Sequence, residues 1–120
     1  MLASGDFDLM QAFFKMYIDA RLLADRRTKA YFNHEGIFFP ETMYFWGAYA
    51  PSNYGWKRDG KPPSFVENTF IRNYFSNSLE LLLMMLDYND YSQDKSFRGP
   101  LIQMAEGVIA FYDKHYERDA

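Results

Sequence analysis

The chain contains no cysteine, which excludes a disulfide framework and any metal site built on thiolate ligands but leaves the cellular compartment open. Basic residues are not in excess either: the 120 residues carry a formal net charge of −3, so no stripe of Lys and Arg is available to neutralise nucleic-acid phosphates. The longest apolar run, residues 81–86, is too short to span a bilayer. Residues 1–8 lack the basic and apolar regions of a signal peptide. The length is that of one small domain, and the sequence predicts no nucleic-acid or membrane partner.

Strand-like alternation is also missing, and three segments show helical spacing instead. The first predicted helix covers about residues 6–30, where apolar side chains recur at steps of three and four before the segment turns polar. A third helix over about residues 98–116 is again amphipathic, with Pro100 in its first turn. The fold class predicted is all-α.

The second predicted helix starts at Ser64 or Asn68 and reaches about Tyr88. Residues 81–86 are apolar without a break, so they cover every side of a helix, and such a helix must be buried on every side. Two partner helices cannot surround a third. The sequence thus predicts a piece of a larger all-helical domain, or an obligate oligomer, that does not form a well-packed monomer by itself.

A loop over residues 31–65 separates the first two helices, and its segment 36–56, GIFFPETMYFWGAYAPSNYGW, is dense in aromatic side chains. Loops normally run over the wet surface and avoid large apolar groups. This loop therefore either plugs the core of a larger domain or lines a pocket. Flat aromatic faces interspersed with polar groups suit the CH-rich faces and hydroxyls of a sugar ring.

The order of these elements resembles the catalytic toroid of glycoside hydrolases and phosphorylases built from six helical hairpins, the (α/α)6 barrel. The residues that carry the resemblance are GIFFPET at 36–42 with Trp46-Gly47 beyond it, and the turn YNDYSQDKSF at 88–97 after the apolar helix. Gln93 stands where that turn usually has glycine. The match is to an alpha-fucosidase-like or otherwise uncharacterised bacterial glycosidase-type family, and it covers about two of the six hairpins.

The resemblance implies a partial toroid catalytic domain over residues 1–120, with the loop 31–65 on its active-site face. It implies hydrolysis of glycosidic bonds by carboxylate acid/base chemistry, with the main general acid and the remaining hairpins outside this chain. It also points to a periplasmic or secreted location. The alternative is a non-catalytic helical-hairpin scaffold or protein-interaction domain. No cofactor is predicted, because the chain has no P-loop, dinucleotide fingerprint or GxSxG motif.

Glu41 is the candidate catalytic residue of the chain. A carboxylate among Phe38, Phe39, Phe45 and Trp46 would be partly desolvated, which raises the pKa as a general acid requires. Binding a sugar hydroxyl and holding the loop together are the other two roles open to Glu41. The candidate stacking surfaces, each of which could equally be core, are Trp46, Tyr49, Tyr54 and Trp56.

Three further polar residues are candidates for substrate binding. His34 could titrate beside Glu35, but there is no HExxH motif and His115 is expected to be remote, so no metal site is predicted. Asn77 and Glu80 lie where the apolar helix should point at the pocket. A buried ion pair of Glu80, with Arg72 for example, is the other interpretation. The acidic residues at 87–94 are expected to cap helices, since Arg98 stands where a calcium loop needs Glu.

Overall fold

The computed structural model describes residues 2–117, and these residues form an all-α fold, as predicted. The helices are α1 (Phe7–Asp19), α2 (Arg21–Phe32), α3 (Pro51–Tyr54), α4 (Asn77–Ser92) and α5 (Arg98–His115), with a short 310 helix, η1 (Lys95–Phe97), before α5. Within the described part of the chain, Met43 and Tyr49 form an isolated β-bridge and there is no sheet. The larger six-hairpin toroid stays a prediction.

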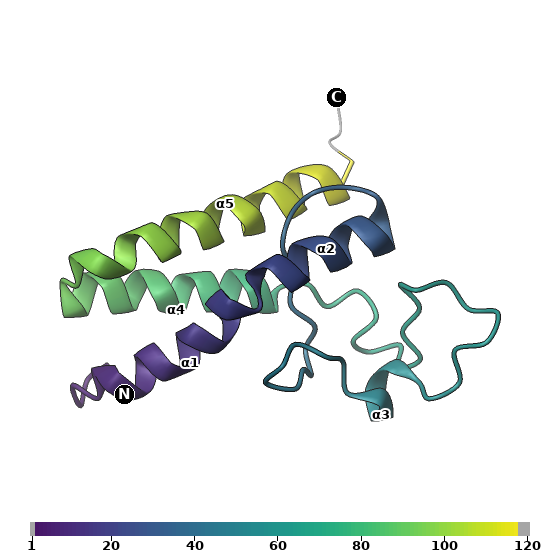
Figure 1. Cartoon of the computed structure of the whole chain (residues 1–120), viewed down its shortest axis with the longest axis horizontal. Helices are drawn as coiled ribbons and strands as arrows, with labels where there is room; N and C mark the ends of the chain where they lie inside the picture. The colour runs from purple at the N-terminus through teal and green to yellow at the C-terminus, as the bar shows by residue number, and fades with distance from the viewer. Residues whose placement is uncertain (1, 118–120) are drawn as a thin grey trace.

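Figure 1 shows α4 and α5 side by side, with α1 and α2 laid along them in sequence. α1 packs on α4 and α2 packs on α5. Apolar stripes of these helices meet in one core, which includes Phe14 of α1, Met85 and Tyr88 of α4, and Met104 and Val108 of α5. The amphipathic character predicted for the third helix is confirmed in α5, which buries Leu101, Met104, Val108 and Phe111.

The single helix predicted over residues 6–30 is wrong, because α1 and α2 meet at a bend. Ala20 has ψ −4°, whereas a regular α-helix has ψ near −42°, so its peptide tilts out of the helical path. The loop packs at this bend: a Cβ built on Gly47 would lie 3.9 Å from the Ala20 Cβ and 2.6 Å from Leu23 Cδ2. No Pro or Gly in the sequence marks the position.

The predicted start of the apolar helix at residue 64 or 68 is also wrong, because α4 begins at Asn77. Asn68 Oδ1 accepts a hydrogen bond from the Phe70 amide at 3.0 Å, and the Ile71 and Tyr74 amides bond to carbonyls three residues back. Local bonds of this kind compete with a helix. The connection therefore extends over residues 33–76, with α3 inside it.

α4 buries only one of its sides within this chain. Leu81, Leu82 and Met85 are buried, whereas Leu79, Leu83 and Leu86 are exposed, Leu83 to 60 %. On the neighbouring α5, Ile102 and Ile109 are exposed as well. Part of the apolar surface of α4 is thus uncovered, as the sequence predicted for a helix with too few partners.

We expect this α4–α5 face to make the chain self-associate and bind hydrophobic dye, because exposed apolar patches associate in water. Leu83→Lys combined with Ile109→Lys should shift sedimentation velocity profiles toward monomer and reduce dye fluorescence. The control is Gln103→Lys, which adds the same charge at an exposed polar site of α5. A wild-type chain that sediments as a single monomeric species and does not bind the dye would contradict the expectation.

The loop begins with a close backbone crossing over α5. The Ile37 amide donates a hydrogen bond to the Gly107 carbonyl at 2.8 Å. Gly36 has φ +120°, and a Cβ built on it would lie 2.3 Å from the Phe111 backbone nitrogen. A Cβ on Gly107 would lie 2.1 Å from Ile37 Cδ1. Gly36 is therefore required by the crossing, whereas a Cβ on Gly107 would force the Ile37 side chain to shift.

Gly36→Ala should lower the free energy of unfolding by roughly 2–4 kcal/mol, since it adds both backbone strain and a clash with backbone atoms. Gly60→Ala is the matched control: its φ is +71°, but no atom lies within 4 Å of the added Cβ. The Gly60→Ala variant should lower the free energy of unfolding by only about 1 kcal/mol, because it adds backbone strain without a clash. Urea unfolding followed by circular dichroism measures both, and equal losses would show that the crossing is not tight.

Candidate functional site

The aromatic loop is held against the first turn of α4. The Phe39 amide donates to Ser78 Oγ at 2.9 Å, and Ser78 is fully buried. Phe38 packs on Phe75, just before α4 begins, with ring centroids 5.4 Å apart. These contacts lay the loop across the beginning of α4, near Asn77.

Glu41 does not face inward, so the predicted desolvated carboxylate is wrong. Its side chain is exposed, although Phe38, Phe39 and Pro40 before it are buried. Its backbone and that of Thr42 lie within hydrogen-bonding reach of Tyr54, whose side chain is only 4 % exposed. Burial raises the pKa of Tyr54, and hydrogen bonding to Thr42 and Glu41 offsets part of the rise. The loop thus presents a carboxylate to solvent from an anchored backbone.

A short polar network continues from this point. Asn53 Nδ2 donates to Thr42 Oγ1 at 3.2 Å, and Asn68 Nδ2 donates to Asn53 Oδ1 at 3.2 Å. The sequence analysis missed Thr42, Asn53 and Asn68 as site residues. Asn is common in turns because its side chain hydrogen-bonds to the nearby backbone, so an Asn in this loop did not by itself indicate a binding site.

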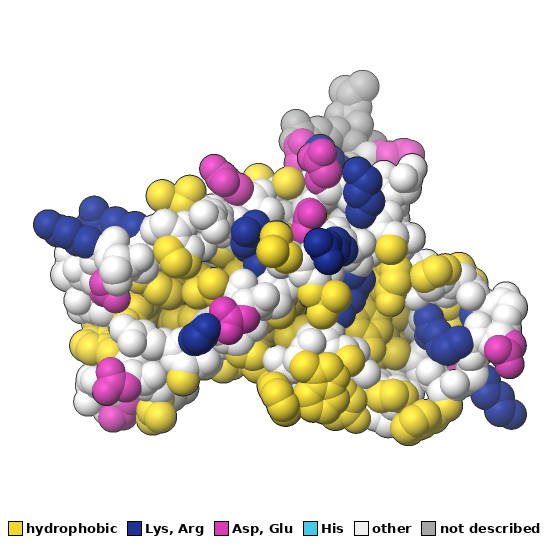
Figure 2. Space-filling view, viewed as in Figure 1, with side chains coloured by type: hydrophobic (Ala, Val, Ile, Leu, Met, Phe, Trp, Pro, Cys, Tyr) yellow, Lys and Arg dark blue, Asp and Glu magenta, His cyan; other side chains and the backbone are white. Residues whose placement is uncertain are grey.

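Trp46 lies at the tip of a tight hairpin. The Tyr44 amide donates to the Ala48 carbonyl at 2.9 Å, and the Gly47 amide to the Tyr44 carbonyl at 2.8 Å. The rings of Tyr44 and Trp46 stack at 4.6 Å and 13°, and Phe45 is 75 % exposed. Hydrophobic side chains gather on this part of the surface in Figure 2. An open hollow of about 570 Å³ separates the tip from α1, lined among others by Lys15, Asp19 and Trp46.

Tyr49 lies in a second hollow, of about 320 Å³, between α2 and the segment 48–58. Its lining residues are Arg27, Tyr31, Ala48, Tyr49, Pro51, Tyr54, Gly55 and Arg58. The Arg27 guanidinium lies 4.5 Å from the centroid of the Tyr49 ring and donates to the Gly47 carbonyl. Burial raises the pKa of Tyr49 far above its ordinary value, and Arg27 opposes the rise. Arg27 was not among the candidate residues, because it lies in the polar half of the first predicted helix and no sequence pattern set it apart there.

The remaining candidates are not brought into this hollow. Trp56 is 77 % exposed, and Asn77 is half-buried at the start of α4. Glu80 is exposed, so the prediction that it is buried is wrong, and so is its pairing with Arg72. Its carboxylate accepts hydrogen bonds from the Tyr74 hydroxyl at 3.1 Å and the Ser76 hydroxyl at 3.3 Å. Arg72 donates instead to the Val66 carbonyl at 3.0 Å.

The capping role predicted for the acidic residues is confirmed at Asp94. Its carboxylate accepts from the Ser96 hydroxyl and amide, which lowers its pKa, and it caps η1. Gln93, which stands where the resembled turn has glycine, adopts a left-handed φ of 54° and ends α4. Among residues 2–117 no group of three or more His, Asp and Glu side chains could hold a metal ion. No helix in that range is long and apolar enough to cross a membrane.

His34 contacts His115, so the prediction that the two are remote is wrong. His34 Nε2 lies 3.0 Å from His115 Nδ1, and His34 Nδ1 lies 2.7 Å from the Glu35 carbonyl oxygen. Because a carbonyl can only accept, His34 carries its hydrogen on Nδ1, and His115 therefore donates from its own Nδ1. The pair joins the end of α2 to the end of α5.

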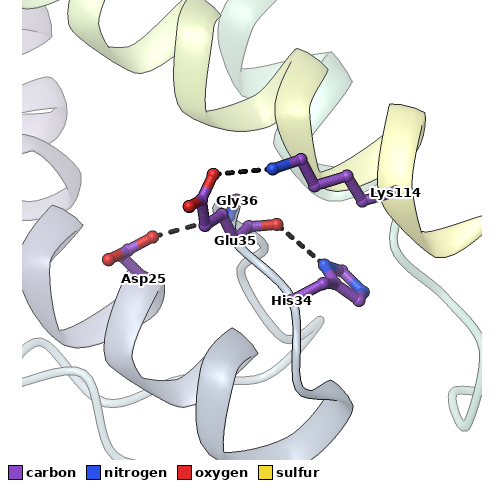
Figure 3. Close-up of polar contacts among 5 residues, drawn as sticks. All are labelled: Asp25, His34, Glu35, Gly36 and Lys114. Atoms are coloured by element: carbon purple, nitrogen blue, oxygen red, sulfur yellow. Dashed lines mark hydrogen bonds and ion pairs between the residues drawn. The ribbon is translucent and has the colours of Figure 1, made fainter.

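Figure 3 shows the other polar contacts of this junction. Lys114 Nζ lies 2.6 Å from Glu35 Oε2, and this hydrogen bond lowers the pKa of Glu35. The Gly36 amide donates to Asp25 Oδ1 at 3.4 Å. Together these bonds hold the beginning of the loop between α2 and α5.

Comparison with models of known protein families, with characterised proteins and with solved structures gives no significant match to this chain.

The histidine pair makes stability depend on pH. Burial lowers the pKa of His115 from its ordinary 6.5, with His34 adding to the effect. The unfolded chain then binds a proton that the folded chain does not, so this stability is complete above pH 6.5 and is lost as pH falls through the lower folded pKa. We expect the free energy of unfolding, from urea titrations between about pH 7.5 and about pH 5.5, to decrease toward acid.

His115→Gln should flatten this decrease, because the titrating imidazole is removed. Lys114→Gln removes the adjacent exposed charge but keeps His115, so the free energy of unfolding should still decrease toward acid as in the wild type. A profile of the same steepness in His115→Gln would assign the pH dependence to other groups.

Proposed function

We propose that the aromatic loop binds a carbohydrate and that the chain acts as part of a glycosidase-type protein. The observation that carries this proposal is the exposed Glu41 carboxylate, presented by a backbone that Tyr54 and Ser78 anchor. Sugar binding needs flat apolar faces and polar groups held in place at low entropic cost. The candidate rings are Tyr49 and Trp46, which line two separate hollows, and the candidate polar groups are Glu41 and Asn53 of the same loop.

Within this proposal, Glu41 accepts hydrogen bonds from sugar hydroxyls and is the candidate for one of the two carboxylates of glycoside hydrolysis. Hydrolysis needs a second carboxylate across the scissile bond. That group, as the resemblance implies, lies in a further hairpin of a toroidal domain. The proposed location, periplasmic or secreted, rests on the resemblance alone.

A second candidate function is supported by a different surface. The exposed Leu79, Leu83 and Leu86 of α4 lie beside an α5 that exposes Ile102 and Ile109, and aliphatic faces of this kind pack against other helices. In that case the chain is a helical scaffold, and the aromatic loop serves contact with a protein. Sugar binding distinguishes the two functions.

The test is a glycan array followed by calorimetric titration of the sugars retained. Glu41→Gln keeps the size and shape of the side chain but removes its charge, so it should weaken sugar binding about tenfold. Glu106→Gln is the matched control, since Glu106 is an exposed carboxylate on α5, outside the loop. It should leave affinity unchanged.

Two results would contradict the proposal. The first is a folded chain that retains no sugar on the array, which would favour the scaffold function. The second is equal loss of affinity in both variants, which would show that Glu41 has no particular role in binding.

A further inference from the structure

Two guanidinium groups face the same small hollow without a carboxylate partner. Arg27 of α2 and Arg58 of the connection both line the 320 Å³ space beside Tyr49. None of the lining residues is acidic, and among residues 2–117 neither arginine forms an ion pair. Glu67 adjoins Gly55 at the edge of the hollow, but it too forms no ion pair there. Neither guanidinium is thus paired with a carboxylate, although the Glu67 carboxylate lies at the edge of the hollow.

Backbone hydrogen bonds hold both guanidinium groups in position. Arg58 Nη1 donates to the carbonyls of Tyr54 at 2.8 Å and Phe65 at 2.7 Å, and Nη2 to that of Pro63 at 2.9 Å. Arg27 donates to the Gly47 carbonyl while its plane lies over the Tyr49 ring. A guanidinium has five N–H donors, so each group keeps donors beyond those used for these bonds. Fixed forks of this kind suit carboxylate and sulfate oxygens.

Tyrosine side chains provide the rest of the hollow. Tyr31, Tyr49 and Tyr54 line it, and the rings of Tyr49 and Tyr54 lie 4.1 Å apart by their centroids. The volume falls at the lower end of the range of roughly 300–1,000 Å³ that is common for small-ligand sites. Arg27 lies over the Tyr49 ring and Tyr54 is buried, so the half-buried Tyr31 and the edge of Tyr49 are the ring surfaces open to a ligand. Such surfaces beside two cations match a ligand that has a flat CH-rich ring and one negative group.

We propose that this hollow binds an acidic sugar, with the anionic group of the sugar between Arg27 and Arg58 and its ring against the tyrosines. The inference rests on the proposed carbohydrate function and names its substrate class: monosaccharide units that carry a carboxylate or a sulfate. Neutral sugars lack the group that would neutralise the two arginines. The site therefore selects by charge as well as by shape.

The experiment titrates the whole chain with D-glucuronate, with D-glucose 6-sulfate, with D-glucose and with inorganic sulfate, by calorimetry or saturation-transfer NMR. Glucuronate or the sulfated sugar should bind about tenfold more tightly than glucose, since a charge-assisted pair contributes on this scale. Arg27→Gln should remove most of that preference, because it should weaken binding of the acidic sugars more than binding of glucose. Arg27→Lys keeps the charge but not the fork, so it should recover only part of the preference.

Arg26→Gln is the matched control, because Arg26 is an exposed arginine of the same helix that does not line the hollow. It should bind all four probes as the wild type does. Circular dichroism and thermal unfolding establish that each variant is folded, and Arg27 has a single backbone hydrogen bond to lose.

The remaining outcomes separate this inference from the function on which it rests. Equal affinity for glucose and for the acidic sugars would overturn the charge selection and leave carbohydrate binding intact. Binding of sulfate as tight as that of the acidic sugars would show a simple anion site and overturn the role of the tyrosines. If none of the sugars binds and the array is also blank, both proposals fail.

Discussion

The crossing of Gly36 and Ile37 over α5 is the contact on which the rest of the structure depends. The Ile37–Gly107 hydrogen bond of 2.8 Å lies beside Gly36, where a Cβ would overlap the Phe111 backbone, and a Cβ on Gly107 would displace the Ile37 side chain. Gly107 stands inside a helix, where glycine costs about 1 kcal/mol relative to alanine. The close approach fixes the direction in which the loop leaves α2. Phe38 and Phe39 are then buried in the core, and the Phe39 amide donates a hydrogen bond to Ser78 Oγ. The Glu41 side chain that follows is exposed.

Features with a regular period were predictable from the sequence, and features that depend on distant contacts were not. α5 follows its apolar stripe closely, and the aromatic loop lies at the beginning of α4 as expected. No Pro or Gly in the sequence marks the bend at Ala20. The bend lies where Gly47 of the loop packs on Leu23, a contact between residues far apart in the sequence. The contact between His34 and His115 joins residues 81 positions apart, and no local pattern could indicate it.

The environment of Glu41 shows why composition alone misjudges a site. Its neighbours in sequence are aromatic, which suggested a desolvated carboxylate, yet desolvation depends on which side of the chain each group faces. The core buries Phe38, Phe39 and Pro40, and Glu41 is the first exposed residue after them. Arg27 and Arg58 were missed because nothing in their sequence neighbourhood indicates that they line a hollow. Arg27 looks like any surface charge of a polar helix, and only folding brings it beside Arg58 and Tyr49.

α4 connects the two surfaces for which functions are proposed. Its first turn holds the loop through Ser78, and its exposed leucines belong to the aliphatic face shared with α5. Whatever covers that face buries apolar area and stabilises α4, because a ligand or partner that binds only the native state adds to its stability. A more stable first turn keeps Ser78, and with it the Phe38–Glu41 backbone, in one conformation. Covering the aliphatic face should therefore lower the entropic cost of sugar binding at the loop, and a sugar bound at the loop should strengthen association at the face by the same free energy.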